Sequence, residues 1–518
     1  TYRVFNDTAD EAAHIACGLE MVQTGRYTIE AQHPPLGRVL LAVPAWLAGL
    51  RYSPHWPLWT GSSPEFYWRT LSMARLGNLV WAPLLLVCVF LWARDLYGRA
   101  AGWGAAVLVS FCPNLLAHAS LATLDFGAAT TVFAAAWCFW RWSRTPSLGY
   151  CVLSAAAFAI AALTKFSALV FLPLIAAAFF LIGRWNTRWW RPSLRWLTAL
   201  GRGALFTAVA GLLIWSGYLF HMGRLGPPQF QPAPGSFAQN FEHWLEKLGA
   251  HRDLPAAQFV AGLRDVAGHN AEGHPSYLLG RISLFGWWYY FPVVLALKTT
   301  LPLLLLAGVS LAASVAGGTG GTARASLCPL AAIVVLLGVS MTSHIDLGVR
   351  HVLAIYPFLA LLASQLCSRL AGPARPGGRR TLAVIVVLLG GWHVGESLVA
   401  APDYLAYFNE TVRGREDEFL LDSNLDWGQD LERLRVFLTE RGITTVHLSF
   451  FGRGKPILER IPGLRPLGPN DRPSGWVAVS KSNIPGLGLG PHNLAWLRAY
   501  TPAARVGKSI LVYYFPER

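Results

Sequence analysis

The chain has 518 residues, of which 53% are apolar and only 14% are charged, and its formal net charge is +15. This composition excludes an ordinary soluble domain. Charge is absent from long windows, so the composition predicts a polytopic α-helical membrane protein. The positive charge does not indicate nucleic-acid binding, because the arginines cluster in short segments between those windows.

The first 69 residues form a polar segment that we predict to be the first extracytoplasmic loop. Asp10, Glu11 and His14 lie close together, so a helix here places His14 one turn beyond the carboxylates. His33 precedes Pro34-Pro35-Leu36, and the two prolines stiffen the backbone beside this helix.

A structural explanation of the acidic residues stays open. Thr8 and Glu11 have the spacing of a capping box. Acidic residues in a first helical turn also stabilise the helix dipole without any further role.

Uncharged windows recur along the chain, and each is long enough to form most or all of a membrane span of roughly 20 residues. They predict about ten spans, and we expect one more upstream of Thr1. The windows are Leu76–Ala93, Ala100–Leu124, Phe126–Trp140, Tyr150–Thr164, Phe166–Gly183, Gly203–Phe220, Thr299–Val315, Ser326–Ser343, Val352–Cys367 and Thr381–His393.

The arginines between the windows set the expected topology. An excess of arginine marks cytoplasmic loops. This places residues 1–69, the loop 221–285 and the segment after residue 401 on the extracytoplasmic side. The clustered arginines are Arg94, Arg99, Arg141, Arg144, Arg184, Arg188, Arg191, Arg195, Arg369, Arg375, Arg379 and Arg380.

The remaining unusual polar residues fall on the same expected side as Asp10. Asp125 begins a span without a basic neighbour in sequence, and a carboxylate there is costly unless it has a function or caps the helix. Lys165 interrupts two apolar windows, either as a phosphate contact or as the turn of a helical hairpin. Arg350 and His351 lie against the charge bias, so we favour a phosphate-binding role over an interfacial anchor.

Residues 401–518 are predicted to form a soluble α/β domain. The apolar spacing indicates a helix over residues 430–441, and strands are expected at 444–451, 475–480 and 509–515. Asp422, Asp426 and Asp430 could bind a cation, but turn and cap roles are favoured. The predicted organisation is therefore an outer loop, a membrane body over residues 70–400, and this C-terminal domain.

These motifs resemble the family-39 type of GT-C glycosyltransferases, which includes protein O-mannosyltransferases and aminoarabinose transferases. The resemblance lies in Asp10-Glu11, His33-Pro34-Pro35-Leu36, Thr123-x-Asp125, Leu163-Thr-Lys165, Leu347–Pro357, Tyr404–Asn409 and Asp422–Asp430. Two departures concern the acceptor. His33 stands where the aminoarabinose transferases usually carry lysine, and the tail lacks the β-trefoil module of eukaryotic O-mannosyltransferases.

The resemblance implies sugar transfer from a polyprenyl-phosphate donor to a glycan, lipid or protein acceptor at the outer face of a bacterial inner membrane. It also implies inversion at the sugar. The implied catalytic residues are Asp10 as base or orienting carboxylate, with Glu11 and Asp125 as partners. His14, His33, Lys165, Arg350 and His351 are the expected substrate-binding residues.

A divalent metal held by Asp10, Glu11 and Asp125 is a further expectation from the resemblance. Two other functions stay open. A transporter or flippase would place polar residues near the membrane midplane, often with internal repeats. A non-catalytic subunit of an envelope assembly would keep the fold and lose the activity.

Overall fold

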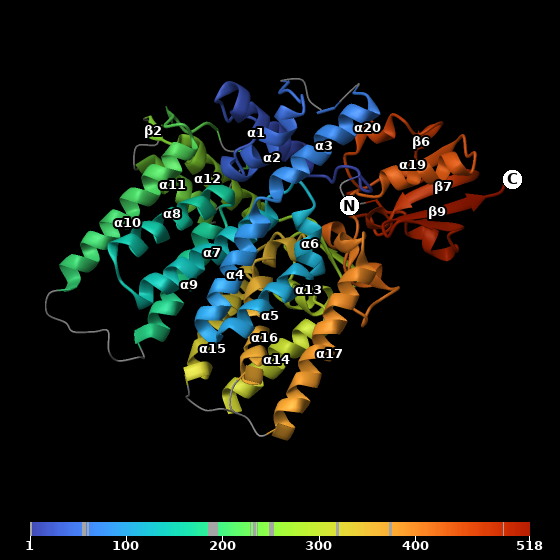
Figure 1. Ribbon diagram of the computed structural model, residues 1–518. Coiled ribbons are helices and arrows are strands. Elements are labelled where there is room, and N and C mark those ends of the chain that lie inside the picture. Colours follow the sequence, from blue (N-terminus) through green and yellow to red (C-terminus); the bar gives the residue numbers. More distant parts are fainter. Residues whose placement is uncertain are drawn as a thin grey trace.

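The computed structural model describes residues 3–53, 58–59, 62–184, 195–227, 229–230, 235, 237–247, 253–316, 321–371, 376–490 and 492–517. Of the clustered arginines, Arg188, Arg191 and Arg375 lie outside the described residues. The described chain is a bundle of apolar helices with short helices over one end and a mixed sheet beside that end (Figure 1).

The N-terminal segment folds into three helices that pack consecutively, α1 against α2 and α2 against α3. Pro35 starts α2 and Pro64 starts α3, in the first helical turn, where proline is tolerated because the missing N–H has no partner to lose. The bounds are α1 Glu11–Thr24, α2 Pro35–Leu47 and α3 Pro64–Asn78.

The predicted apolar windows all contain helices. The bounds are α4 Trp81–Tyr97, α5 Arg99–Ser110, α6 Pro113–Ala119, α7 Asp125–Arg144, α8 Leu148–Thr164, α9 Ala168–Arg184, α10 Arg195–Gly217, α14 Leu301–Ala316, α15 Gly321–Ser340, α16 Ile355–Ala371 and α17 Pro376–Ala400. Helix α7 packs against α4, α8 and α9, and α16 packs against α5 and α14. Large apolar side chains of α17, such as Val387 and Val399, face outward, as expected for contact with lipid.

Three of these helices, α5, α6 and α14, belong to bent pairs, and the partner of α14 is α13, Tyr290–Lys298. Helices α5 and α6 bend by 62° where Pro113 follows the break, and α13 bends by 110° into α14. Among the described residues, three helices are long and apolar enough to cross a membrane, or up to five if each bent pair is one span. Shorter apolar helices, including α8 and α16, occupy other predicted windows. The expected number of about ten spans stays a prediction.

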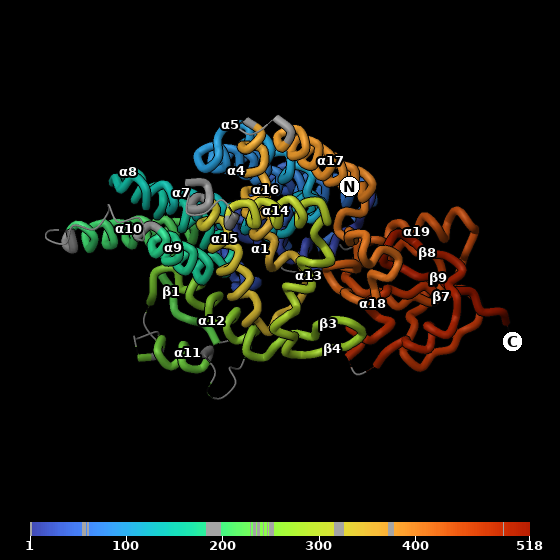
Figure 2. Tube along the Cα trace, turned by 90° about the horizontal axis from the view of Figure 1, so that it is seen from below, coloured from blue at the N-terminus to red at the C-terminus, as the bar shows by residue number. Residues whose placement is uncertain are grey.

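The outer loop 221–285 contains short strands and two helices, and a helix follows it. The bounds are β1 Met222–Gly223, α11 Phe237–Lys247, β2 Leu254–Pro255, α12 Ala257–Glu272, β3 Ser276–Leu278, β4 Arg281–Ser283 and α13 Tyr290–Lys298. Strand β1 pairs with β2, and β3 pairs with β4, both antiparallel. Figure 2 shows α11 and α12 at the edge away from the C-terminal sheet.

The C-terminal residues contain a five-stranded sheet of order β6-β5-β7-β9-β8. Strand β5 is parallel to β6 and β7, and β9 is antiparallel to β7 and β8. The bounds are α18 Glu416–Phe419, α19 Leu431–Glu440, β5 Val446–Ser449, α20 Lys455–Leu458, β6 Leu464–Pro466, β7 Gly475–Ser480, β8 Ala504–Val506 and β9 Ile510–Phe515. The predicted helix and three strands are confirmed, while β6 and β8 were not predicted.

The C-terminal sheet shares a hydrophobic core with the N-terminal helices. Ile15 and Leu19 of α1 belong to the same buried cluster as Leu434 of α19 and Val446 of β5. The 3₁₀ helices are η1 Val349–Val352, η2 Tyr404–Ala406, η3 Asp422–Asn424, η4 Lys481–Asn483 and η5 Ala495–Ala499. Of these, η3 packs against η1 and η2, and η2 packs against α6. The C-terminal residues are therefore packed directly on the segment that carries Asp10.

The arrangement of α17 generates a test of the predicted topology. This helix starts at the end of the bundle opposite α1 and finishes beside the C-terminal residues (Figure 1). Cysteine placed at the exposed position Arg379, near the start of α17, should therefore react only with a cytoplasmic membrane-impermeant thiol reagent. Cysteine at the exposed position Arg281 should react only from outside. The parent protein provides the background labelling, and labelling of both positions from one side would contradict the topology.

Candidate functional site

The fold brings Asp10 and Arg350 together although they are 340 residues apart in sequence. Asp10 directly precedes α1, and Arg350 lies on η1, between α15 and α16. The Arg350 Nη1 donates to Asp10 Oδ2 at 2.6 Å. The Asp10 side chain remains 37% exposed while that of Arg350 is only 10% exposed. The pair therefore presents a reachable carboxylate against a largely desolvated guanidinium.

A second ion pair joins Asp125 to Lys165. Asp125 is the first residue of α7, and Lys165 directly follows α8. The Lys165 Nζ donates to Asp125 Oδ1 at 2.6 Å, and Nδ1 of His118 lies 4.0 Å from Asp125 Oδ2. The N-cap residue of α7 is Leu124, so Asp125 lies in the first helical turn and not at the cap position. Its partner, which could not be found near it in sequence, lies 40 residues away.

The two ion pairs lie close enough to influence one another. Burial raises the pKa of Asp10, but the Arg350 guanidinium and His14 lower it by more, so its net shift is downward, and Asp125 acts on it in the opposite direction. Asp10 is therefore held as an anion in the free protein. A carboxylate in this state is a weak base until its cationic partner moves away.

His14 is held neutral by its surroundings. Burial, and next the charge of Arg38, lower its pKa to about 3. The Arg38 Nε donates to His14 Nδ1 at 3.3 Å, which places the ring proton on Nε2. The His33 ring contacts the His14 ring edge to face, with centroids 5.2 Å apart. His14 can thus donate one hydrogen bond near Asp10 but cannot act as a cation at neutral pH.

Arg38 was not predicted as a site residue, yet it organises the His33-Pro34-Pro35 turn. Its Nη1 donates to the carbonyl groups of Glu30 at 2.8 Å and of His33 at 3.3 Å. It also forms an ion pair with the Glu30 carboxylate. The available sequence signal was an arginine near the start of an otherwise apolar helix. The structure shows that this arginine is fully buried.

Glu11 has a different environment from Asp10. It is fully buried, and both of its oxygens contact Arg75, at 2.8 and 2.7 Å. It accepts further hydrogen bonds from the backbone N–H of Thr8 at 2.8 Å and of Ala122 at 2.6 Å. Only the bond from the Thr8 backbone to the Glu11 carboxylate matches the expected capping box, because α1 begins at Glu11 and its N-cap residue is Asp10. Glu11 thereby ties α1 to α3 and to the loop before α7.

The three predicted metal ligands do not fit a common metal site. Asp10, Glu11 and Asp125 each contact a different cationic side chain. In the described part of the chain, no group of three or more His, Cys, Asp or Glu residues is placed to hold a metal ion. The arrangement instead offers one reachable carboxylate with flanking cations.

His351 directly follows Arg350 in η1. Its ring stacks on Phe291 with centroids 6.3 Å apart. Burial, and next the charges of Lys165 and Arg350, place its pKa well below its usual value. His351 is therefore near the ion pairs as a neutral group.

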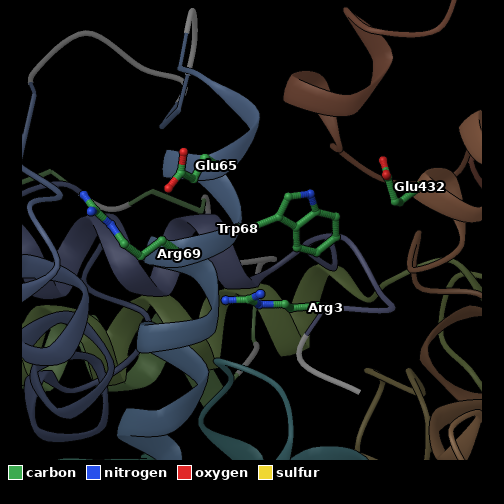
Figure 3. Close-up of a pocket in the computed structure, with 5 residues that line it drawn as sticks. All are labelled: Arg3, Glu65, Trp68, Arg69 and Glu432. Atoms are coloured by element: carbon green, nitrogen blue, oxygen red, sulfur yellow. The ribbon is translucent and has the colours of Figure 1, made fainter.

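A separate surface cavity of about 400 Å³ lies between α3 and the C-terminal residues. Figure 3 shows Trp68 in the middle of the view with Arg3 below it. Glu432 lies to one side of Trp68, and Glu65 and Arg69 lie to the opposite side. None of the predicted site residues lines this cavity.

Comparison with known families adds independent information. Residues 69–215 match the model of the dolichyl-phosphate-mannose-protein mannosyltransferase family. Comparison with curated proteins gives no match. The matched segment includes Asp125 and Lys165 of the second ion pair.

Solved structures with a related arrangement come from bacteria and archaea. ArnT from Cupriavidus metallidurans bound to undecaprenyl phosphate is 14% identical over 98% of this chain and 94% of its own, with a TM-score of 0.49. The oligosaccharyltransferase AglB from Archaeoglobus fulgidus, in complex with an inhibitory peptide and a dolichol-phosphate, is 12% identical over 93% of this chain and 66% of its own, also at 0.49. The same archaeal enzyme complexed with Zn and sulfate is 12% identical over 93% and 65%, at 0.45.

The family match over residues 69–215 agrees with the class predicted from the motifs, a membrane glycosyltransferase.

The buried Asp7, which accepts a hydrogen bond from the Tyr67 hydroxyl, generates a pH prediction. Burial raises the pKa of Asp7 from 3.8 to about 6, against the hydrogen bond from Tyr67. A carboxyl group with a raised folded-state pKa stabilises the fold fully below its unfolded pKa, and this contribution is lost as pH rises through the folded pKa. Between pH 4 and pH 7 the wild type should therefore lose up to about 3 kcal/mol from this group.

Asp7→Asn should remove this part of the pH dependence, because the amide carries no titrating proton and can still accept from Tyr67. Melting of the purified protein in detergent across this pH range measures it. Asp471→Asn, at an exposed loop position, is the control and should leave the wild-type slope. An unchanged slope in Asp7→Asn would rule out Asp7 as the source.

Proposed function

We propose that the protein moves a sugar from a polyprenyl-phosphate donor to an acceptor at the extracytoplasmic face of a bacterial inner membrane, with Asp10 as the base. The observation that carries this proposal is the Asp10–Arg350 ion pair. It combines an exposed carboxylate with a guanidinium whose Nε is buried and makes no hydrogen bond within the described structure. A buried donor without a partner is costly, which favours an anionic ligand at this position.

The proposed reaction is a single displacement at the anomeric carbon. The acceptor hydroxyl oxygen forms the new bond to that carbon, and Asp10 accepts its proton. The bond from carbon to the donor phosphate oxygen breaks, and the polyprenyl phosphate leaves with the bonding electrons. Lys165 and Arg350 stabilise the negative charge that develops on the leaving phosphate. This route inverts the configuration of the sugar.

The pairing of Asp10 with Arg350 suggests an order of events. In the free protein, Arg350 holds Asp10 as a weak base. A donor phosphate competes for the same guanidinium through bidentate hydrogen bonds. When Arg350 turns to the phosphate, Asp10 loses its counter-charge and becomes more basic. The carboxylate is therefore activated only when the donor is bound, which protects against unproductive reactions.

The other predicted residues have supporting roles in this proposal. Glu11 positions Asp10 through its bonds to Arg75 and Ala122. Asp125 holds Lys165 at the site. The neutral His14, beside His33, is placed to donate a hydrogen bond to a substrate oxygen. In this proposal His351 lies beside the phosphate position as a neutral side chain.

The acceptor class follows from the same site. An exposed base at the outer end of the helices can receive a glycan, lipid or protein hydroxyl from the extracytoplasmic side. The polyprenyl chain would lie among the apolar helices while its phosphate meets the outer turns. Among the described residues, Asp10, Glu11 and Asp125 each face a different cationic side chain, so the proposed steps are assigned to these side chains.

Asp10→Asn separates the base from the helix-cap interpretation. Turnover should fall by about 10²–10⁴-fold, the usual loss for a general base. Binding of polyprenyl phosphate should become tighter by about fivefold, since Arg350 no longer has to leave a partly exposed ion pair worth about 1 kcal/mol. Sugar transfer and lipid binding, both with protein in nanodiscs, measure the two effects.

Asp253→Asn is a matched control, because Asp253 also pairs with an arginine, Arg224, at 3.4 Å. It should change neither measurement. Arg350→Ala should instead weaken lipid binding and also lower turnover, because Arg350 is the proposed contact of the leaving phosphate. Normal turnover in Asp10→Asn would remove Asp10 from the mechanism, whereas absence of sugar transfer by the wild type would favour a non-catalytic subunit.

A further inference from the structure

The C-terminal residues reach the site through η3, which packs against η1. The backbone N–H of Val349 donates to Asn424 Oδ1 at 3.0 Å, and the Ser423 hydroxyl donates to the Leu347 carbonyl. Gly348 has a φ of 137°, and a Cβ there would lie 2.7 Å from Ser423 Oγ. The turn that presents Arg350 is therefore shaped directly by the C-terminal residues.

Trp427 contacts both sides of the Asp10–Arg350 pair. Its ring centroid is 4.4 Å from Cζ of Arg350, and its side chain is almost fully buried. Its carbonyl accepts the backbone N–H of Ala9, the residue before Asp10, at 3.2 Å. A ring at this distance holds a guanidinium by a cation–π interaction and leaves the edge donors free for an anion.

Three acidic residues in this segment, which the sequence could not separate, have different partners. Asp426 accepts the backbone N–H groups of Ser482 and Gly428. Asp430 accepts those of Lys508 and Ser509. Both therefore join loops within the C-terminal residues.

Asp422 is the exception among the three. It has a φ of 55°, a left-handed conformation that is uncommon for residues other than glycine and that clusters at functional sites. Its carboxylate accepts the backbone N–H of Ser423 and acts electrostatically on Arg350 and Asp10. Asp422 also belongs to η3, which packs against the η1 helix that carries Arg350.

We propose that residues 422–427 hold Arg350 for donor binding, with Trp427 and Asp422 as positioning residues of the transfer site. Trp427 fixes the plane of the guanidinium, and Asp422 becomes its carboxylate partner when Arg350 leaves Asp10. This inference rests on the proposed role of Arg350 as a contact of the donor phosphate. It gives the C-terminal residues a part in catalysis beyond packing.

The test is a double-mutant cycle in the full-length protein in nanodiscs, with polyprenyl phosphate as the probe. Trp427→Leu should weaken its binding by about 5- to 30-fold, the range expected for a desolvated cation–π contact. In the Arg350→Ala background the same substitution should have no further effect, because the partner is gone. Trp427→Phe keeps a ring and should restore most of the affinity.

A control substitution accompanies the cycle. Trp476→Leu removes a tryptophan of β7 that contacts Tyr514, and it should leave binding unchanged.

The role of Asp422 is tested separately. Asp422→Asn should lower kcat for sugar transfer by about tenfold, a typical loss for one charged contact, with little change in the KM for donor. Asp430→Asn, which alters a buried acid outside residues 422–427 that accepts the backbone N–H groups of Lys508 and Ser509, should leave the ratio of kcat to KM per folded molecule unchanged.

The outcomes distinguish the two proposals. If Arg350→Ala binds polyprenyl phosphate normally, the donor contact itself is wrong and this inference falls with it. If Arg350→Ala weakens binding but Trp427→Leu and Trp427→Phe do not, only the role of residues 422–427 is wrong. An equal loss from Trp427→Leu with and without Arg350 would show that Trp427 acts only through packing.

Discussion

The ion pair between Asp10 and Arg350 connects the N-terminal segment to the turn between α15 and α16 and determines what the site can do. It places the one well-exposed carboxylate of the group beside a largely desolvated guanidinium. An ion pair of this kind stabilises both charges only while it stays closed, and it can be opened by a stronger anion. A phosphate is such an anion, so the resting geometry already contains the competition that would control the reaction.

The surrounding structure keeps this pair in place from three directions. Below Asp10, the buried Glu11–Arg75 pair fixes α1 against α3. Beside it, Arg38 holds His14 neutral and supports the His33-Pro34-Pro35 turn. From the C-terminal side, Trp427 contacts Arg350 and binds the backbone next to Asp10. The buried network can thus be rigid while Asp10 itself stays accessible.

Much of this could be predicted from sequence, for a physical reason. Charged residues are costly in apolar surroundings, so Asp125, Lys165 and Arg350 stood out against uncharged windows. Their partners could not be assigned, because Lys165 is 40 residues from Asp125 and Arg350 is 340 from Asp10. Trp427 was one of 22 tryptophans and carried no signal of its own. The helix bends were also missed, although Pro113 marked one of them.

The roles of adjacent residues show the same limit. Asp10 and Glu11 are equivalent in sequence, yet one faces the open side of α1 and the other is buried against Arg75. Asp422, Asp426 and Asp430 recur at equal spacing, yet only Asp422 acts on Arg350. Spacing along a chain gives the face of an element, whereas the partner on that face comes from tertiary packing.

A structure of the protein with bound polyprenyl phosphate would test the central claim most directly. The account predicts that the phosphate contacts Arg350 and Lys165, and that the Asp10–Arg350 contact, 2.6 Å in the free protein, is broken. A phosphate bound elsewhere with this ion pair intact would contradict it.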